Sequence, residues 1–216
     1  MTDARGAGGR PGAVRGRGPD PLRASWRNTT HDWAATVDHA HLEAVRRTPA
    51  AYAPGGVRHL ILEVLAYAAD EAECTGGGRA LVRLHPDGSV SVTDDGRGTD
   101  TRLDAAGRPV KKPVMATKDL RFFDAPDAPP LPDGHPRRGM SVVAALSDWL
   151  IHTNRRADGS WTQRYEHGVP VTDLDPVAAD GRTGTRVHFR PAAGLGEASG
   201  TGLTDWPPHL TVEVER

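Results

Sequence analysis

The hydrophobic pattern of the chain is clearest in the segment 57–72, VRHLILEVLAYAADEA. Its apolar residues recur at helical spacing, which predicts a long helix with one face in the core. Glu63, Tyr67, Asp70 and Glu71 recur at i, i+4, i+7 and i+8 and are therefore grouped on the other, polar face. The same pattern alone would also fit an ordinary solvated helix face.

Two further helices are expected from the pattern. One is predicted between Ser25 and Ala51, where an apolar stripe is stopped by Pro49. A second core helix is predicted over 141–150, SVVAALSDWL, because its apolar residues also follow helical spacing.

Alternating apolar and polar residues predict strands between and after these helices. Segments 80–84 and 90–93 alternate around a turn at 85–88, HPDG, which is typical of a hairpin. Further strands are expected near 150–155, 160–166 and 185–190, with a last one in HLTVEVE at 209–215. This order of elements predicts an α/β (α+β) two-layer sandwich, with helices on one face of a mixed, mostly antiparallel sheet.

Composition adds two irregular regions to this picture. Glycine and proline supply 25 and 18 of the 216 residues, which is high for a globular chain. Residues 1–25 hold five arginines and few large apolar residues, so 1–37 is interpreted as a tail without a core of its own. Residues 99–138 carry seven prolines and little periodicity, which predicts a long loop or lid with at most a short helix near 113–121.

Charge and cysteine content exclude several classes of function. The net charge is -1 and the isoelectric point is about 6.8, so overall charge predicts neither direct DNA binding nor a membrane partner. Cys74 is the single cysteine, which excludes an internal disulfide and a cysteine-based zinc cluster. The sequence has no apolar stretch long enough to span a bilayer and no signal-peptide pattern, so a cytoplasmic location is expected.

Three separate signals suggest chemistry. Glu63 lies on the long helix, Asp94 is followed by Gly96 and Gly98 at the end of a strand, and 183–185, TGT, leads into another strand. A buried aspartate can accept the exocyclic amine of adenine, glycines allow a purine to approach the backbone, and a threonine hydroxyl can fix a shared water. A helix glutamate near the phosphates could activate water as a general base. Taken singly, these signals fit a solvated helix face or plain turns better than a functional site.

Several segments, in the same order, resemble the ATPase domain in the B subunit of bacterial DNA gyrase. They cover about residues 38–192 and include LEAVRRTPAAY, HLILEVLAYAADEA, DGSVSVTDDGRG, GRP, SVVAALSDWL, QRYEHGVPVTDL and RTGTRVHFRP. The resemblance implies the GHKL fold with the Bergerat nucleotide site, which Hsp90, histidine kinases and MutL share. It divides the chain into the tail 1–37, the nucleotide-binding domain 38–192 and a short tail 193–216 that is too short for the family's transducer domain.

The resemblance also implies roles for individual residues. Glu63 matches the catalytic base, and Asp94 matches the aspartate that binds adenine. Gly98 and Thr185 complete that pocket, and Gly96 lies between Asp94 and Gly98 in the same motif.

Two arginines match positions that contact ring ligands. Arg97 matches the arginine that lies over the adenine or inhibitor ring and is expected to pair with Glu71. Arg156 matches an arginine that contacts aminocoumarin inhibitors.

The sequence departs from the family on the helix itself. Tyr67 occupies the position of the family's magnesium-binding asparagine. An amide oxygen is a hard ligand suited to Mg²⁺, whereas a neutral phenol is a poor, bulky substitute. No metal ligand is therefore assigned, and the substitution argues against magnesium-dependent hydrolysis. The remaining histidines show no metal-binding spacing.

The phosphate-binding loop is altered as well. The segment 133–139 reads DGHPRRG, whereas the family has a glycine-rich loop whose N–H groups wrap the phosphates. Gly139 is retained, but Pro136 has no N–H to donate. Arg137 and Arg138 could replace the missing donors by direct charge on a phosphate, and an exposed basic turn is the equal alternative.

Three functions remain open on these grounds. The first is a protein that binds ATP or ADP, with weak or no hydrolysis. The second is a pseudo-ATPase that binds an aminocoumarin-like inhibitor or a regulatory partner. The third is an active ATPase domain of the DNA topoisomerase type that acts with other subunits. A monomer or weak dimer is expected, because the family's dimerisation arm is not recognisable in 1–37.

Overall fold

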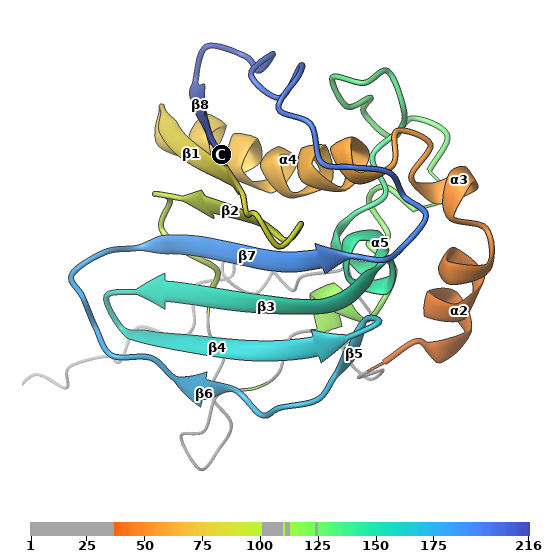
Figure 1. Cartoon of the computed structure of the whole chain (residues 1–216). Helices are drawn as coiled ribbons and strands as arrows, with labels where there is room; N and C mark the ends of the chain where they lie inside the picture. The colour runs from red at the N-terminus through yellow and green to blue at the C-terminus, as the bar shows by residue number, and fades with distance from the viewer. Residues whose placement is uncertain (1–36, 101–109, 111–112, 124) are drawn as a thin grey trace, which may run out of the picture.

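The computed structural model describes residues 37–100, 110, 113–123 and 125–216. Within them the chain forms two layers, a twisted eight-stranded sheet and a set of helices on one of its faces (Figure 1). Nearly all of the predicted tail 1–37 and part of the predicted loop 99–138 lie outside the described residues.

The sheet is mixed and mostly antiparallel, as the sequence predicted. Its strand order is β5-β4-β3-β7-β2-β1-β8, with β6 paired to β4, and among the described strands only β1 and β8 run parallel. The strands are β1 Gly78–Leu84, β2 Val90–Asp94, β3 Ser147–Arg156, β4 Gly159–Glu166, β5 Val169–Pro170, β6 Asp175–Pro176, β7 Gly184–Pro191 and β8 Leu210–Glu215. The predicted hairpin and the predicted last strand are confirmed as β1–β2 and β8.

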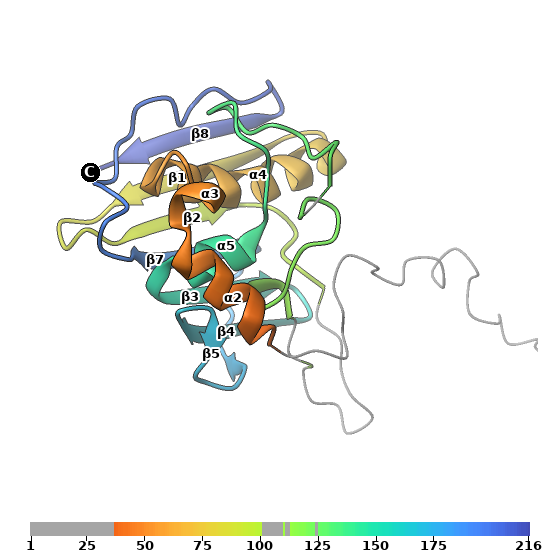
Figure 2. The same ribbon diagram turned by 90° about the vertical axis from the view of Figure 1, so that its right-hand side faces the viewer.

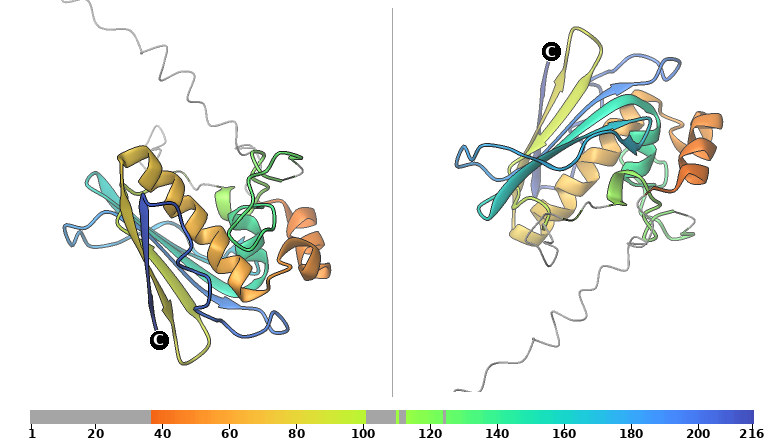
Figure 3. Two further views of the ribbon diagram at one scale, coloured as in Figure 1. Left: turned by 90° about the horizontal axis from the view of Figure 1, so that it is seen from above. Right: turned by 90° about the horizontal axis from the view of Figure 1, so that it is seen from below.

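The helices cover a single face of the sheet (Figure 2). They are α2 His39–Arg47, α3 Pro49–Tyr52, α4 Val57–Thr75, the 3-10 helix η1 Pro113–Met115 and α5 Met140–Ala145. Viewed along the sheet, α4 and α5 lie side by side against this face, and none of the described helices lies on the opposite face (Figure 3). Among the described residues, no helix combines the length and the apolar character needed to cross a bilayer.

The long helix α4 forms where the sequence predicted it. It begins after Gly56, whose backbone is left-handed and where a Cβ would collide with the carbonyl oxygen of Leu195. It ends at Gly76, whose left-handed conformation provides the usual stop. Its apolar residues, including Leu60, Ile61 and Leu65, are fully buried and form the centre of the core.

The predicted helix over 141–150 is wrong in its second half. The helix α5 ends at Ala145, and β3 begins at Ser147. Leu150 is fully buried and pairs with Tyr165 of β4 and Phe189 of β7, so it belongs to a strand of the sheet and not to a helix. In so short a segment, the apolar spacing fits both a helix and a strand. Pairing with the two neighbouring strands makes residues 147–150 part of a strand.

Pro49 follows closely on the end of the predicted helix, as expected, and it also has a second role. The helix α2 ends at Arg47, and Pro49 opens the next short helix, α3, at its first position. This is where a proline is tolerated, since the N–H that it lacks would have had no partner in the helix. Near the predicted short helix at 113–121, the structure has only the single turn η1.

The position of Leu150 generates a stability prediction. Leu150→Ala is expected to lower the free energy of unfolding by about 2–5 kcal/mol, because it leaves a cavity between the sheet and the helices. Denaturant unfolding followed by circular dichroism measures this loss. Val171→Ala is the control, because Val171 is 49% exposed and its truncation is expected to cost less than about 0.5 kcal/mol. A Leu150→Ala loss below about 1 kcal/mol would contradict this description of the core.

Candidate nucleotide site

Glu63 lies in the middle of α4 and is fully buried, with an exposed fraction of 0%. The alternative of a solvated helix face is therefore wrong at this position. One carboxylate oxygen accepts the backbone N–H of Arg138, and the other accepts that of Gly139 at 2.9 Å. A buried carboxylate needs such donors, because an unpaired charge is costly away from water.

His59, one turn before Glu63, completes the surroundings of this carboxylate. Its Nε2 lies 3.5 Å from a Glu63 oxygen, and its Nδ1 lies 2.7 Å from an oxygen of Asp133. Burial lowers the pKa of His59, but its interactions with Glu63 and Asp133 outweigh burial and raise the pKa above its ordinary value of 6.5. The loop that precedes α5 is thus attached to α4 through four of its residues, Asp133, Arg137, Arg138 and Gly139.

Asp94 ends β2 and forms the second centre of the site. Its Oδ1 accepts the backbone N–H of Gly96 at 2.9 Å and that of Thr185 at 3.2 Å, and its Oδ2 accepts the Thr185 hydroxyl. Burial raises the pKa of Asp94 above its ordinary value of 3.8, although the hydrogen bonds from Thr185 and Gly96 oppose this shift. We call Asp94, Gly96, Gly98 and Thr185 the strand-end site.

Two glycines allow the segments around the strand-end site to approach each other. Gly184, at the start of β7, has a φ of 113°, and a Cβ there would collide with the carbonyl oxygen of Asp94. Gly98 has a φ of 74°, and a Cβ there would collide with the carbonyl oxygen of Arg155. Only glycine fits both the backbone conformation and the space at these positions.

Two arginines lie at the rim of this site. Arg97 donates two side-chain bonds to Glu71 of α4, at 2.7 and 3.0 Å, so the pairing that the resemblance implied is present. The side-chain hydrogen bonds from Arg97 are the main cause that lowers the pKa of Glu71. Arg156 donates to the carbonyl oxygen of Gly98 at 2.8 Å and also pairs with Asp158 at 3.2 Å.

A hollow opens between α4 and the loop that follows β2. It measures about 230 Å³, and its lining includes Ala68, Glu71, Asp94, Gly96 and Arg97. Part of the strand-end site is therefore accessible from outside.

Tyr67 lies one helical turn beyond Glu63, and its surroundings differ from those of an exposed tyrosine. Its hydroxyl donates to Oδ2 of Asp119 at 2.9 Å. Burial, followed by the charge of Asp119, raises the pKa of the phenol well above its ordinary value. Burial also raises the pKa of Asp119, but the hydrogen bonds and charge of Arg121 outweigh it and hold that pKa below 3.8.

Arg137 is buried beside the same tyrosine, with an exposed fraction of 4%. Its guanidinium lies 4.3 Å from the ring centre of Tyr67 and 4.0 Å from that of Phe122, and it pairs with Asp70 at 2.8 Å. The alternative of an exposed basic turn is therefore wrong for Arg137. We call Tyr67, Asp119, Arg121, Phe122 and Arg137 the tyrosine–arginine cluster.

Arg138 and Gly139 lie at the junction between this cluster and Glu63. Both donate their backbone N–H groups to Glu63, while the Arg138 side chain lies 5.8 Å from the ring centre of Phe123. Gly139 has a φ of 97°, and a Cβ there would approach the Tyr67 hydroxyl to 3.1 Å.

The structure thus places the predicted residues in two groups. Asp94, Gly96, Gly98 and Thr185 form one group, with Arg97 and Arg156 at its rim, and Glu63, Tyr67, Arg137, Arg138 and Gly139 form the other. Sequence reasoning missed His59, Asp119, Phe122, Asp133 and Asn154. The spacing of His59 four residues before Glu63 was the one readable signal, because such residues share a helix face.

Asn154 is a missed residue of the first group. Its amide exchanges two hydrogen bonds with the backbone of Thr99, at 2.7 and 2.9 Å, and so fixes the point where the loop after β2 leaves the sheet. Nothing in the local pattern of β3 separates it from the other polar strand residues.

The residues around Tyr67 do not fit a magnesium ion. The phenol donates its proton to Asp119, while Asp119 and Asp70 are each paired with an arginine. Mg²⁺ needs oxygen ligands that are free to coordinate it. Across the described part of the chain, no three His, Cys, Asp or Glu side chains gather as a metal site.

Comparison with known proteins places this geometry in context. The chain is 34% identical over 155 residues to the B subunit of DNA topoisomerase 4 from Bacillus subtilis (strain 168), covering 69% of this chain and 24% of that protein. It is 35% identical over 155 residues to the B subunit of DNA gyrase from Thermotoga maritima, again covering 69% of this chain and 24% of that protein. It is 37% identical over 152 residues to the B subunit of DNA gyrase from Mycolicibacterium smegmatis, covering 68% of this chain and 22% of the relative.

A solved structure gives the same result at the level of the fold. The topoisomerase IV ATP-binding domain of Francisella tularensis, in complex with a small-molecule inhibitor, matches with a TM-score of 0.55 and 26% identity over 70% of this chain and 41% of that one. No family model matches the sequence. The chain spans about a quarter of the length of the curated relatives. Sequence and fold together identify the chain as a GHKL ATPase domain of the type IIA topoisomerase B-subunit family.

Proposed function

We propose that this domain binds adenine nucleotides at the strand-end site and does not hydrolyse ATP at an appreciable rate. The observation that carries the proposal is the contrast between the two halves of the site. Asp94 and Thr185 are already hydrogen-bonded to each other beside an open hollow, whereas the tyrosine–arginine cluster fills the region next to Glu63.

The strand-end site supports adenine recognition by its hydrogen-bonding capacity. Asp94 Oδ2 receives only the Thr185 hydroxyl among the described residues, and a carboxylate oxygen can accept more than one donor. The exocyclic amine of adenine supplies such a donor. Arg97, held by Glu71 at the rim, presents a flat guanidinium of the kind that stacks on aromatic rings.

The surroundings of Glu63 support the absence of turnover. A general base needs an open lone pair within reach of the attacking water. Each oxygen of Glu63 accepts one backbone N–H group, and the side chain has no exposed surface through which an attacking water could reach the remaining lone pairs. The neighbouring carboxylates, Asp70 and Asp119, are each neutralised by an arginine.

Arg137 supports binding of a diphosphate or triphosphate without a metal ion. Its Nε and Nη2 groups are buried and make no hydrogen bond within the described residues, so they are available donors if the loop moves. A guanidinium can neutralise the charge of phosphate oxygens directly, and in a conventional ATPase a metal ion neutralises that charge.

A second candidate is a binding module for inhibitors of gyrase and topoisomerase IV. It is favoured by Arg156, which lies at the rim of the strand-end site, and by the inhibitor bound to the Francisella domain. Novobiocin binding that is weakened by Arg156→Ala, with ADP binding unchanged, would favour this candidate. An active topoisomerase-type ATPase that works with other subunits is the third candidate, and it requires phosphate release.

The role of Asp94 can be tested by calorimetry with ADP. Asp94→Asn is expected to weaken ADP binding by about tenfold to a hundredfold, because a bond to a charged acceptor is lost. Asp95→Asn is the matched control, since Asp95 accepts the backbone N–H of Arg79 instead. Equal affinity of wild type and Asp94→Asn, or no ADP binding at all, would refute the proposed adenine site.

The raised pKa of Asp94 predicts a pH dependence of binding. Protonation removes the charge that accepts the adenine amine, so ADP affinity is expected to fall as the pH is lowered through the pKa of Asp94. Because that pKa lies above the ordinary 3.8, the fall begins at a higher pH than for an exposed aspartate. Affinity measured against pH should show this decline in the wild type and a much flatter profile in Asp94→Asn.

Hydrolysis and metal dependence are tested together. Wild type with Mg-ATP is expected to release no phosphate above background, and its ATP affinity should be the same in Mg²⁺ and in EDTA. Phosphate release that Glu63→Gln abolishes would overturn the non-hydrolysing part of the proposal and favour the third candidate, while leaving nucleotide binding intact.

A further inference from the structure

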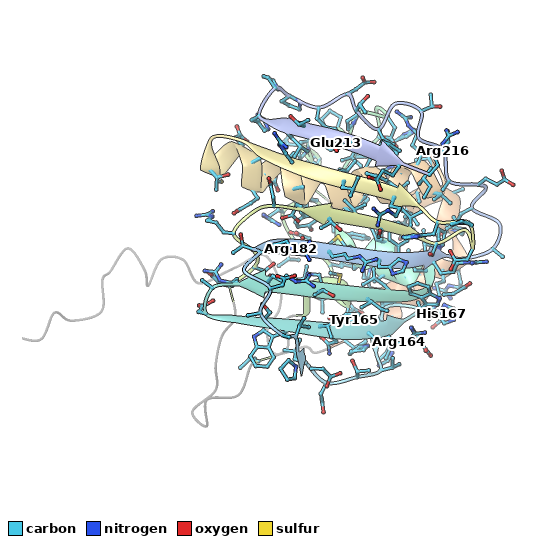
Figure 4. The ribbon with its side chains drawn as sticks, turned by 60° about the vertical axis from the view of Figure 1, so that its left-hand side comes forward. Arg164, Tyr165, His167, Arg182, Glu213 and Arg216 are labelled. Atoms are coloured by element: carbon cyan, nitrogen blue, oxygen red, sulfur yellow. The ribbon has the colours of Figure 1, made fainter. Side chains whose placement is uncertain are left out.

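The face of the sheet opposite the helices is rich in arginine. Along β1, Ala80 and Val82 point into the core, so Arg79 and Arg83 point to the opposite, uncovered face. On β7, Val187 is buried in the core, which places the neighbouring side chain of Arg186 on the uncovered face as well. Figure 4 shows this face, with Glu213 on β8 and Arg182 just before β7.

A hollow of about 610 Å³ lies over this part of the sheet. Five arginines line it, from β1, β3, β7 and the loop before β7; they are Arg79, Arg83, Arg155, Arg182 and Arg186. Asp94, Asp95 and Thr185 line it as well, so it adjoins the strand-end site. We call it the basic hollow. Its volume is in the range of sites that hold small molecules.

Arg186 of β7 lines the basic hollow, with strands β2 and β3 on either side of it. Burial lowers its pKa, and the charges of Arg83 and Arg155 lower it further. Within the described residues no carboxylate lies within ion-pair distance of Arg186. By contrast, Arg83 pairs with Glu215 at 2.9 Å, and Arg182 pairs with Asp180 at 2.8 Å.

Hydroxyl groups flank Arg186. Register places Thr93 of β2 on one side of Arg186 and Thr153 of β3 on the other. Hydroxyls and guanidinium groups together suit the oxygens of phosphate, because both donate hydrogen bonds and the guanidinium adds charge.

Charge at the edge of the hollow favours a compact ligand over a polymer. Glu213 lines the hollow from β8, and Glu215 lies on the same strand. A long polyanion that crossed the sheet would meet these carboxylates, whereas a small one can remain between Arg186, Arg155 and Arg83. We propose that the basic hollow binds a compact polyanion with two or more phosphate groups, held by the arginines on the uncovered face of the sheet.

Tripolyphosphate is a suitable probe, since it carries the charge without a base. The full chain is expected to bind it in calorimetry at low ionic strength, and added salt should weaken the binding. Arg186→Gln is expected to reduce the affinity at least tenfold. Its thermal stability should stay equal or rise, because the substitution removes repulsion from Arg83 and Arg155. A purely structural arginine would show the opposite change in stability.

A control variant makes this test specific. Arg164→Gln changes an arginine on the same face that lies over Trp149 and pairs with Glu166, and it should leave tripolyphosphate binding unchanged.

Three results would overturn the proposal. They are no binding of tripolyphosphate by the wild type, equal losses in Arg164→Gln and Arg186→Gln, and Arg186-dependent binding of a single-stranded DNA of about 20 nucleotides that is tighter than that of tripolyphosphate. The last result would identify an extended nucleic acid as the ligand instead.

Discussion

One buried carboxylate needs hydrogen-bond donors, and this need organises the packing at the centre of the domain. Glu63 is carried into the interior by a helix whose neighbouring residues are apolar, and it has no access to water. The backbone N–H groups of Arg138 and Gly139 satisfy it, with His59 alongside. These bonds hold the irregular chain before α5 against α4, and that chain in turn positions Arg137.

The two halves of the site consequently differ in how they are organised. At the strand-end site, glycine backbones allow β2 and β7 to meet, and the Asp94 carboxylate stays beside an open hollow. In the tyrosine–arginine cluster, stacked rings and ion pairs satisfy most of the polar groups from within the chain. A ligand can enter the first half with little rearrangement, whereas access to the second requires side chains to move.

The sequence was informative where periodicity and motif coincide. It predicted the long helix, the hairpin and the last strand, because each segment is long enough to show a clear helical or strand periodicity. It failed at 141–150, where a short apolar run suited both a helix and a strand, and contacts with β4 and β7 decided between them. The placement of Asp119 and Phe122 could not be predicted, since they come from a proline-rich loop whose path depends on tertiary contacts.

The same limit applies to the site around Tyr67. The sequence showed that Tyr67 replaces a magnesium ligand, but it did not show that the hydroxyl of Tyr67 bonds to Asp119. The basic hollow was hidden for a different reason, since a net charge close to zero conceals arginines that the sheet gathers on one face.

The parallel pairing of β1 with β8 has a consequence for synthesis on the ribosome. Gly78 pairs with Leu210, so one edge of β1 lacks its partner strand until residues from the far end of the domain have emerged. An open edge of this kind can pair with other chains. The hairpin β1–β2 can form early, but the nascent domain depends on its last strand to cover that edge.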